Sequence, residues 1–218
     1  MDKKQPTKEN TAPYIRYLGW LTGLFPDFDF FFIKSVRKTA AELLQLKPGD
    51  RVIDAGCGSG GSFPFLVADV GPGGEVVGIE ISPASAESAR RRISKNGWRN
   101  VSVITAPAEG AKLDGMFDGV LMFAAPDVFA SPAAWQNLGP HLKQNARVAF
   151  FGAKLTRRPG GVILNPVLRT LYRLSLSTTP GPDLQPWDAV GAYVEGIEVR
   201  EYFFGLMFLA AGRVRSVR

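Results

Sequence analysis

The sequence predicts an α/β fold in which helices cover both faces of a mostly parallel sheet, giving a three-layer sandwich. From residue 33 to about residue 153, short apolar runs alternate with segments of helical length. This alternation predicts parallel strands joined by crossover helices. Near the C-terminus, only Gly205 separates two strand-like runs at 197–204 and 206–211. That spacing is typical of an antiparallel hairpin and places one at the edge of the sheet.

The elements are expected in a regular order along the chain. A helix is expected over residues 33–46, because the apolar residues there share one face and Pro48-Gly49 follows. Strands are expected at residues 51–55, 75–80, 101–105, 117–123 and 146–152, and helices near residues 62–70, 83–95, 132–142 and 162–176.

Composition predicts one globular domain with additions at its periphery. The chain has 218 residues, of which 45% are hydrophobic and 21% charged, as in ordinary globular proteins. We divide it into an N-terminal tail with an apolar cap segment (1–32) and a main domain (33–218), which contains a lid-like insertion (153–185). A single Cys and a single His exclude a disulfide framework and make a metal site unexpected.

The charge and the N-terminus bear on location. The net charge is +6, and residues 151–182 contain five basic residues and no acid. Such a stretch attracts phosphate or anionic lipid, although an ordinary solvated face has the same composition. The N-terminus does not resemble a signal peptide, and charges and a proline interrupt the apolar segment 14–33. A cytoplasmic location is expected, with peripheral contact at an anionic membrane surface left open.

The most informative segment is the loop at residues 54–61, which reads Asp-Ala-Gly-Cys-Gly-Ser-Gly-Gly. Glycines let a backbone adopt positive φ and approach a ligand closely, and open α/β sheets bind ligands at the carboxyl ends of their strands. Glu80 ends the second strand, where an acid accepts ribose hydroxyls, and Asp54 can pair with an ammonium group. Together these features fit S-adenosylmethionine (SAM), an adenosine that carries an amino acid.

A dinucleotide is the rival ligand. Gly56, Gly58 and Gly61 also satisfy the pattern G-x-G-x-x-G, so an NAD(P)-dependent oxidoreductase is an alternative. Asp54, two residues before the first of these glycines, would repel a pyrophosphate but attract a methionine ammonium. No second nucleotide-binding half is evident, and a terminal hairpin is foreign to the usual dehydrogenase sheet. These points favour SAM.

The same motifs resemble the class I SAM-dependent methyltransferases. The resemblance rests on the loop 54–60, on Glu80 closing Val-Val-Gly-Ile-Glu, and on Phe-Asp-Gly-Val at 117–120. It covers about residues 34–153 and the final hairpin, and it implies a Rossmann-like seven-stranded sheet of order 3-2-1-4-5-7-6. Within the family, the segments 48–54, 62–65 and 205–208 are similar to phospholipid N-methyltransferases and quinone C-methyltransferases.

The resemblance also implies a set of cofactor-binding residues. They are Asp54, Ala55, Gly56, Cys57, Gly58, Gly60, Glu80, Ile81, Ala108, Glu109 and Phe123. In this set Ile81 would pack on the adenine, Ala108 and Glu109 would flank its edge, and Phe123 would line the methyl-transfer pocket. Pro107 stands where many relatives have Asp, so the adenine amino group would need Glu109 or a backbone carbonyl as its acceptor.

The sequence leaves the catalytic residues unassigned. Methyl transfer from a sulfonium is an in-line displacement that depends mainly on positioning, and it needs a base only when the nucleophile must lose a proton. Asp127, Tyr17 and His141 are weak candidates. Asp127 is equally suited to capping a helix, and Tyr17 is equally suited to packing. By its position in the family, His141 lies in a turn that is away from the ligand face.

The acceptor is expected to be a hydrophobic small molecule or a lipid-like compound. Ala124-Ala125-Pro126 replaces the Asn-Pro pairing of amide and base N-methyltransferases, so no nucleic-acid partner is expected. Residues 14–33 and 162–179 are apolar and carry arginines, which predicts a lid for such an acceptor, with a packed helix as the plainer alternative. A SAM-binding regulatory subunit without transferase activity is the alternative function, and the oligomeric state is open.

Overall fold

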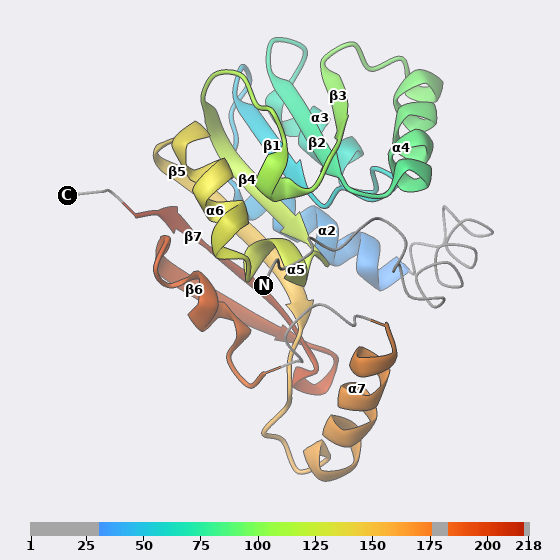
Figure 1. Ribbon diagram of the computed structural model, residues 1–218, viewed down its shortest axis with the longest axis vertical. Coiled ribbons are helices and arrows are strands. Elements are labelled where there is room, and N and C mark those ends of the chain that lie inside the picture. Colours follow the sequence, from blue (N-terminus) through green and yellow to red (C-terminus); the bar gives the residue numbers. More distant parts are fainter. Residues whose placement is uncertain (1–30, 176–182, 216–218) are drawn as a thin grey trace, which may run out of the picture.

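The computed structural model describes residues 31–175 and 183–215. These residues form one seven-stranded sheet of order β3-β2-β1-β4-β5-β7-β6 (Figure 1). Strands β1 to β5 are parallel, and β7 is inserted antiparallel between β5 and β6. The strand order implied by the family resemblance is therefore confirmed, and so is the terminal hairpin.

The elements lie close to their expected positions. The strands are β1 (Arg51–Ala55), β2 (Glu75–Glu80), β3 (Val101–Thr105), β4 (Phe117–Phe123), β5 (Leu142–Ala153), β6 (Val194–Tyr202) and β7 (Met207–Val214). The helices are α2 (Phe31–Leu43), α3 (Phe63–Val70), α4 (Pro83–Asn96), α5 (Pro126–Phe129), α6 (Pro132–Leu138) and α7 (Gly161–Ser175). Short 3-10 turns are η1 (Ala108–Gly110), η2 (Gly139–His141), η3 (Pro186–Val190) and η4 (Phe203–Gly205).

The largest difference from expectation lies between α6 and β5. The helix expected over residues 132–142 ends at Leu138, and η2 carries the chain into β5. Strand β5 then begins at Leu142, four residues earlier than expected, because Leu142 pairs with Phe117 of β4 before a shift in register. Residues 143–145 are polar, so the sequence did not predict a strand there. Their strand conformation comes from the pairing of β5 with β4.

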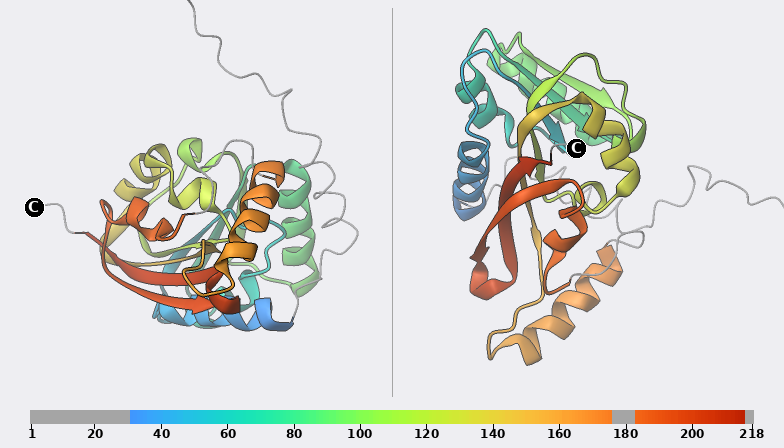
Figure 2. Two further views of the ribbon diagram at one scale, coloured as in Figure 1. Left: turned by 90° about the horizontal axis from the view of Figure 1, so that it is seen from below. Right: turned by 90° about the vertical axis from the view of Figure 1, so that its left-hand side faces the viewer.

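Helices cover both faces of the sheet (Figure 2), and an apolar core lies between the sheet and each helical layer. On one face, α2, α3 and α4 pack on the sheet, with Phe63 and Leu66 of α3 fully buried. On the other face, α5, α6 and η3 enclose Phe150 and Phe208. Burial of apolar surface in these two cores is the main contribution to the stability of the domain. It also fixes the carboxyl ends of the strands, where the loop 54–61 lies.

Local sequence fixes the ends of the helices. Ser82 caps α4 by accepting a hydrogen bond from the Ser85 amide at 3.4 Å, and Ser131 caps α6 in the same way through the Ala134 amide at 3.2 Å. A proline follows each cap, and a side-chain cap of this kind stabilises a helix by about 1 kcal/mol. Helices α4 and α6 thus begin where the sequence predicts.

Helix α7 stands apart from the rest of the domain (Figures 1 and 2). Its start is anchored by Asn165, whose side chain accepts from the Thr156 amide and donates to the Thr156 carbonyl, both at 2.9 Å. Val162, Ile163 and Val167 are exposed, although apolar residues on a helix of this pattern usually pack against a partner. In the described ranges, no helix is long and apolar enough to cross a membrane.

Candidate functional site

The loop 54–61 turns sharply at the carboxyl end of β1. The amides of Gly56 and Cys57 both donate to the Ile79 carbonyl of β2, at 2.8 and 3.0 Å. Gly56, Gly58 and Gly60 all have positive φ, at 81°, 56° and 78°. The loop is therefore held against the neighbouring strand in a conformation that side chains rarely adopt.

The three glycines differ in what surrounds them. A Cβ atom at Gly56 would lie 2.6 Å from Cβ of Ala125, and one at Gly60 would lie 2.6 Å from the Phe63 ring. At Gly58, by contrast, a Cβ atom would meet nothing within 4 Å. Gly56 and Gly60 are thus needed for packing, whereas Gly58 borders open space that a ligand can fill.

Asp54 is the first residue of this loop and lies near the end of β1. Its side chain is fully buried, and neither carboxylate oxygen has a hydrogen-bond partner. Burial raises the pKa of Asp54 to about 7; the nearby Arg37 charge opposes this shift, the Glu80 charge adds to it, and the Ser62 hydroxyl close by opposes it. A buried carboxyl group without a donor is costly, so Asp54 is suited to receive a cationic group from a ligand.

Glu80 joins the loop to the second strand. Its Oε2 accepts the Gly58 amide at 2.9 Å, and its Oε1 accepts the Ser82 amide at 2.7 Å. Burial raises the pKa of Glu80, and these backbone donors oppose the shift. A carboxylate has about four acceptor sites, and these two amides leave room for it to accept a ribose hydroxyl.

The structure adds Arg37 of α2, which sequence reasoning missed. Its Nη1 donates to Oγ of Ser62 at 3.2 Å, and its guanidinium lies 4.2 Å from the Phe123 ring centroid. The other partner of Phe123 is Phe151, stacked at 4.4 Å. Arg37 follows Ile33 by four residues, and residues at this spacing lie on the same face of a helix. Because Ile33 packs against the core, this spacing could have predicted that Arg37 points toward the sheet.

The remaining residues expected at the cofactor differ in accessibility. Ile81 is 63% exposed, and it lies next to Glu80, as a platform for a flat ring requires. Ala108 is buried, and its carbonyl accepts from the Asn137 side chain at 2.8 Å. Phe123 is also buried. Contact between Phe123 and a ligand is therefore limited to what Arg37 and Phe151 leave uncovered.

Acidic side chains gather near this end of the sheet. Partial burial and then the charge of Glu109 raise the pKa of Asp127, which lies at the start of α5. The charge of Asp127 in turn contributes to the raised pKa of Glu80. Asp127 and Glu109 thus belong electrostatically to the same cluster as Glu80.

One of the weak catalytic candidates, His141, lies away from this cluster. His141 lies in η2, where its Nδ1 is 3.1 Å from the Gly115 carbonyl. It precedes Leu142, which pairs with Phe117 at the amino end of β4, whereas the loop lies at the carboxyl end of the neighbouring β1. Tyr17 and nearly all of the cap segment 1–32 lie outside the described residues.

With this geometry in place, the chain can be compared with known proteins. Residues 46–165 match the family described as "Methyltransferase domain", which is more than half of the chain. The chain belongs to this methyltransferase family. The matched region contains the loop 54–61, Glu80, Glu109 and Asp127, so the family assignment covers the whole acidic site.

Relatives and solved structures agree with the assignment. The chain is 27% identical over 124 residues to aklanonic acid methyltransferase DauC of Streptomyces sp. strain C5, covering 55% of each chain. It is 33% identical over 121 residues to 2-phytyl-1,4-naphtoquinone methyltransferase of Trichormus variabilis, covering 52% of this chain and 51% of the relative. The chain thus spans about half the length of these relatives.

One solved structure shows the same fold. The N-methyltransferase NodS from Bradyrhizobium japonicum WM9, in complex with S-adenosyl-L-homocysteine, matches with a TM-score of 0.63 at 14% identity. The match covers 87% of this chain and 90% of that chain. At this identity it supports the fold of this methyltransferase and nothing finer.

The cofactor of this methyltransferase domain is SAM. The site fits a cationic amino-acid nucleoside, because it contains a buried carboxylate without a donor and an open cradle at Gly58. It does not suit a dinucleotide, because a pyrophosphate on the same loop would face Asp54. The rival interpretation from the G-x-G-x-x-G pattern is thereby set aside.

Proposed function

We propose that this chain transfers the methyl group of SAM to a hydrophobic small-molecule or lipid-like acceptor. The observation that carries the proposal is the buried Asp54 carboxylate, which has no hydrogen-bond partner and begins the loop whose backbone borders open space at Gly58. In this proposal, Asp54 and the loop amides hold the amino-acid end of the cofactor, and Glu80 holds the ribose. Ile81 packs on the adenine, and Glu109 lies near its edge.

Catalysis is proposed to depend on positioning. When bound, SAM supplies a methyl group on an already activated leaving group. The chain's part is to hold that group in line with the acceptor atom and to exclude water, which can lower a barrier by several kcal/mol, about 7–11 kcal/mol in the best oriented cases. If the acceptor must lose a proton, we propose Asp127 as the base, because partial burial raises its pKa and so makes it a stronger base than an exposed carboxylate.

The exposed apolar side chains support an acceptor of low polarity. Val162, Ile163 and Val167 on α7 are 84%, 74% and 53% exposed, and Phe204 at the hairpin tip is 78% exposed. Val162 and Ile163 are neighbours on α7, and exposed apolar residues that lie together commonly mark a binding surface. The names of the two relatives point the same way, since one is a phytyl-naphthoquinone methyltransferase and the other methylates aklanonic acid.

We also propose that α7 touches the surface of an anionic membrane. The helix presents its exposed valines and isoleucine beside Arg169, and Arg157 and Arg158 precede it. A surface that combines apolar and basic side chains is suited to the headgroup region of a bilayer. A lipid-like acceptor could then be taken up from the membrane itself.

An assay with labelled SAM tests the proposed function. The protein is incubated with methyl-labelled SAM and with either a lipid extract or a polar extract of cells, and the labelled product is identified. We expect label in an apolar product from the lipid extract. If SAM binds but no extract accepts label, the alternative of a SAM-binding regulatory subunit is favoured instead. If label enters only polar products, the apolar acceptor is wrong while methyl transfer stands.

A further inference from the structure

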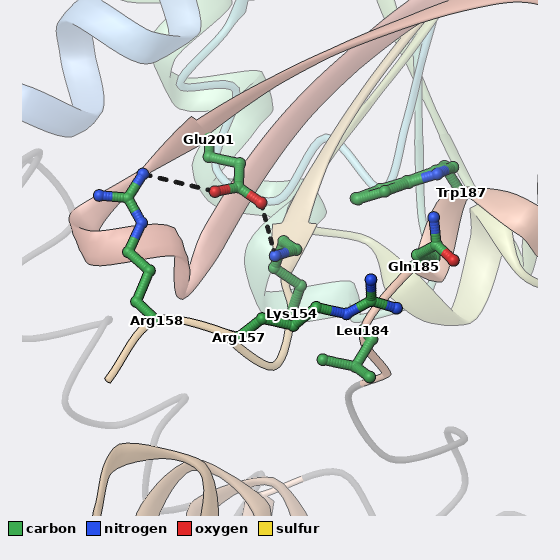
Figure 3. A pocket seen from close by; sticks show the side chains of 7 residues that line it. All are labelled: Lys154, Arg157, Arg158, Leu184, Gln185, Trp187 and Glu201. Carbon is green, nitrogen blue, oxygen red and sulfur yellow. Dashed lines mark hydrogen bonds and ion pairs between the residues drawn. The ribbon is translucent and has the colours of Figure 1, made fainter. Parts of the chain in front are cut away.

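A basic cavity lies beyond the carboxyl end of β5, outside the loop 54–61. It has a volume of about 300 Å³ and lies between the chain that leaves β5, the segment before η3 and the end of β6 (Figure 3). Its lining residues are Lys154, Arg157, Arg158, Leu184, Gln185, Trp187 and Glu201.

The back of the cavity is an ion-paired network. Lys154 is almost fully buried and donates to Oε1 of Glu201 at 2.7 Å and to the Gly205 carbonyl at 3.3 Å. Arg158 pairs with the other oxygen, Oε2, at 3.5 Å. These cations lower the pKa of Glu201, chiefly through the hydrogen bond from Lys154. Both oxygens of the single acid in the cavity are therefore already engaged.

Arg157 leaves the cavity with uncompensated positive charge. Its side chain is exposed and, within residues 31–175 and 183–215, makes no hydrogen bond or ion pair. In Figure 3 its guanidinium extends toward Leu184 and Gln185, away from Glu201. The lining of the cavity thus contains three cations and one carboxylate. Because a guanidinium presents a planar fork of donors, it can bind a carboxylate or phosphate through two bonds at once.

An aromatic wall completes the cavity. Trp187 packs edge-to-face on Phe208 at 5.4 Å and lies 5.9 Å from Nζ of Lys154. Leu184 adds a second apolar surface. A cavity with a free cation on one side and an indole on the other matches an anionic group attached to an apolar body.

The position of the cavity suits the far end of an acceptor. Phe151 of β5 lies level with Phe123 at the end of β4, and these rings stack near the cofactor loop. Lys154 comes three residues later, or roughly 10 Å further along the chain at the rise of an extended strand. The cavity therefore lies beyond the same edge of the sheet as the cofactor loop, past the end of β5.

We propose that this cavity binds an anionic group, a phosphate or a carboxylate, with Arg157 as its main ligand. That the anion belongs to the methyl acceptor rests on the proposed function, whereas anion binding itself does not. Acceptors would then be amphiphiles whose charged end binds here while the apolar part extends toward the cofactor.

Titration with inorganic phosphate tests the cavity without any need for methyl transfer. Binding is measured by calorimetry at constant ionic strength, for the wild type, for Arg157→Gln and for Arg200→Gln. Arg200 is the matched control, because it is an exposed arginine next to Glu201 on β6 whose side chain points to the opposite face of the strand. We expect saturable binding in the wild type and in Arg200→Gln, and binding at least about tenfold weaker in Arg157→Gln.

A second arm distinguishes the source of the anion. Co-sedimentation with phosphatidylcholine vesicles, with and without phosphatidic acid, is measured for the same three proteins. Binding of both phosphate and phosphatidic acid that depends on Arg157 identifies a lipid headgroup, whereas Arg157-dependent binding of phosphate alone identifies a soluble anion. Arg157-dependent vesicle binding without phosphate binding assigns Arg157 to the membrane-contacting surface and overturns the cavity as an anion site. Equal behaviour of all three proteins in both arms overturns the proposal. SAM affinity, measured in parallel, reports separately on the proposed function and should be unchanged in both variants.

Discussion

The amide of Gly58 donates to Oε2 of Glu80 at 2.9 Å, across 22 residues of sequence. This bond ties the open position of the glycine loop to the acid that ends β2. The second oxygen of Glu80 accepts from Ser82, two residues later. One carboxylate thus orders both the cofactor loop and the start of α4. Its loss should therefore lower both the affinity for the ligand and the stability of the fold.

Replacing Glu80 tests this relationship. Glu80→Ala removes the proposed acceptor of the ribose hydroxyls and frees the Gly58 amide, so SAM affinity measured by calorimetry should fall at least about tenfold. The unfolding free energy should fall by only about 1–2 kcal/mol, since the freed amides can bond to water. Glu80→Gln should lie between Ala and the wild type. Wild-type affinity in both variants would remove Glu80 from the site.

Gly58 separates a binding role from a folding role. Gly58→Ala should cost about 1–2 kcal/mol of stability, because alanine at φ 56° is strained although no atom obstructs its Cβ. The new methyl group would also occupy the cradle and weaken SAM binding. The matched control is Gly97→Ala, which has φ 67° and equally open surroundings at the end of α4. It should show the same loss of stability in thermal unfolding, with SAM affinity unchanged.

The pKa of Asp54 near 7 predicts a pH dependence of cofactor binding. Between pH 6 and 7.5 the carboxyl group ionises, so SAM affinity should rise, and above about pH 8 it should level off or fall as the amino group of the ligand loses its proton. Asp54→Asn should bind weakly at every pH and show no rise. Equal pH profiles for the two proteins would contradict the pairing of Asp54 with the ammonium.

The same group has a consequence for stability with the opposite sign. The folded-state pKa of Asp54 lies above its ordinary value, so the folded protein binds more protons than the unfolded chain between about pH 4 and 7. The contribution of Asp54 to the unfolding free energy should therefore fall as pH rises through this window and stay constant above it. Urea unfolding of the ligand-free protein at pH 5 and pH 8, compared with Asp54→Asn, measures the difference.

Because Lys154 is buried, removing its partner Glu201 should lower the unfolding free energy strongly. Glu201→Ala leaves the ammonium with only the Gly205 carbonyl as an acceptor, and we expect a loss of about 2–3 kcal/mol in the unfolding free energy. Glu195→Ala, an exposed acid on the same strand, should cost under about 0.5 kcal/mol. Because the pKa of Glu201 is lowered in the folded state, its contribution should be present above its ordinary pKa and disappear as pH falls through the folded value.

The apolar face of α7 predicts salt-sensitive membrane binding. Vesicles that contain phosphatidylglycerol should sediment the wild-type protein at low salt and less of it at high salt, because screening weakens attraction between the arginines and the lipid. The double variant Val162→Ser/Ile163→Ser should bind at most half as well. Met116→Ser is the control, since Met116 is an exposed apolar residue before β4, at the other end of the sheet. Absence of binding at low salt would exclude this surface.

The sequence determined the strands and the cofactor loop because their signals are local. Strands β1 to β4 begin and end at the expected residues, since short apolar runs bounded by turn residues fix them. The pattern Asp-Ala-Gly-Cys-Gly at residues 54–58 also fixed the place of the site, because positive φ needs glycine wherever the backbone bends this sharply.

Tertiary structure decided what depends on residues distant in sequence. Arg37 lies beside the Gly61 backbone and opposes the raised pKa of Asp54, and no local pattern contains that approach. Lys154 and Glu201 are 47 residues apart, and their ion pair exists only because β7 brings the end of β6 back beside β5. The first residues of β5 also form a strand only because Leu142 pairs with Phe117 of β4. Such contacts are set by the packing of whole elements, which a chain read in order does not reveal.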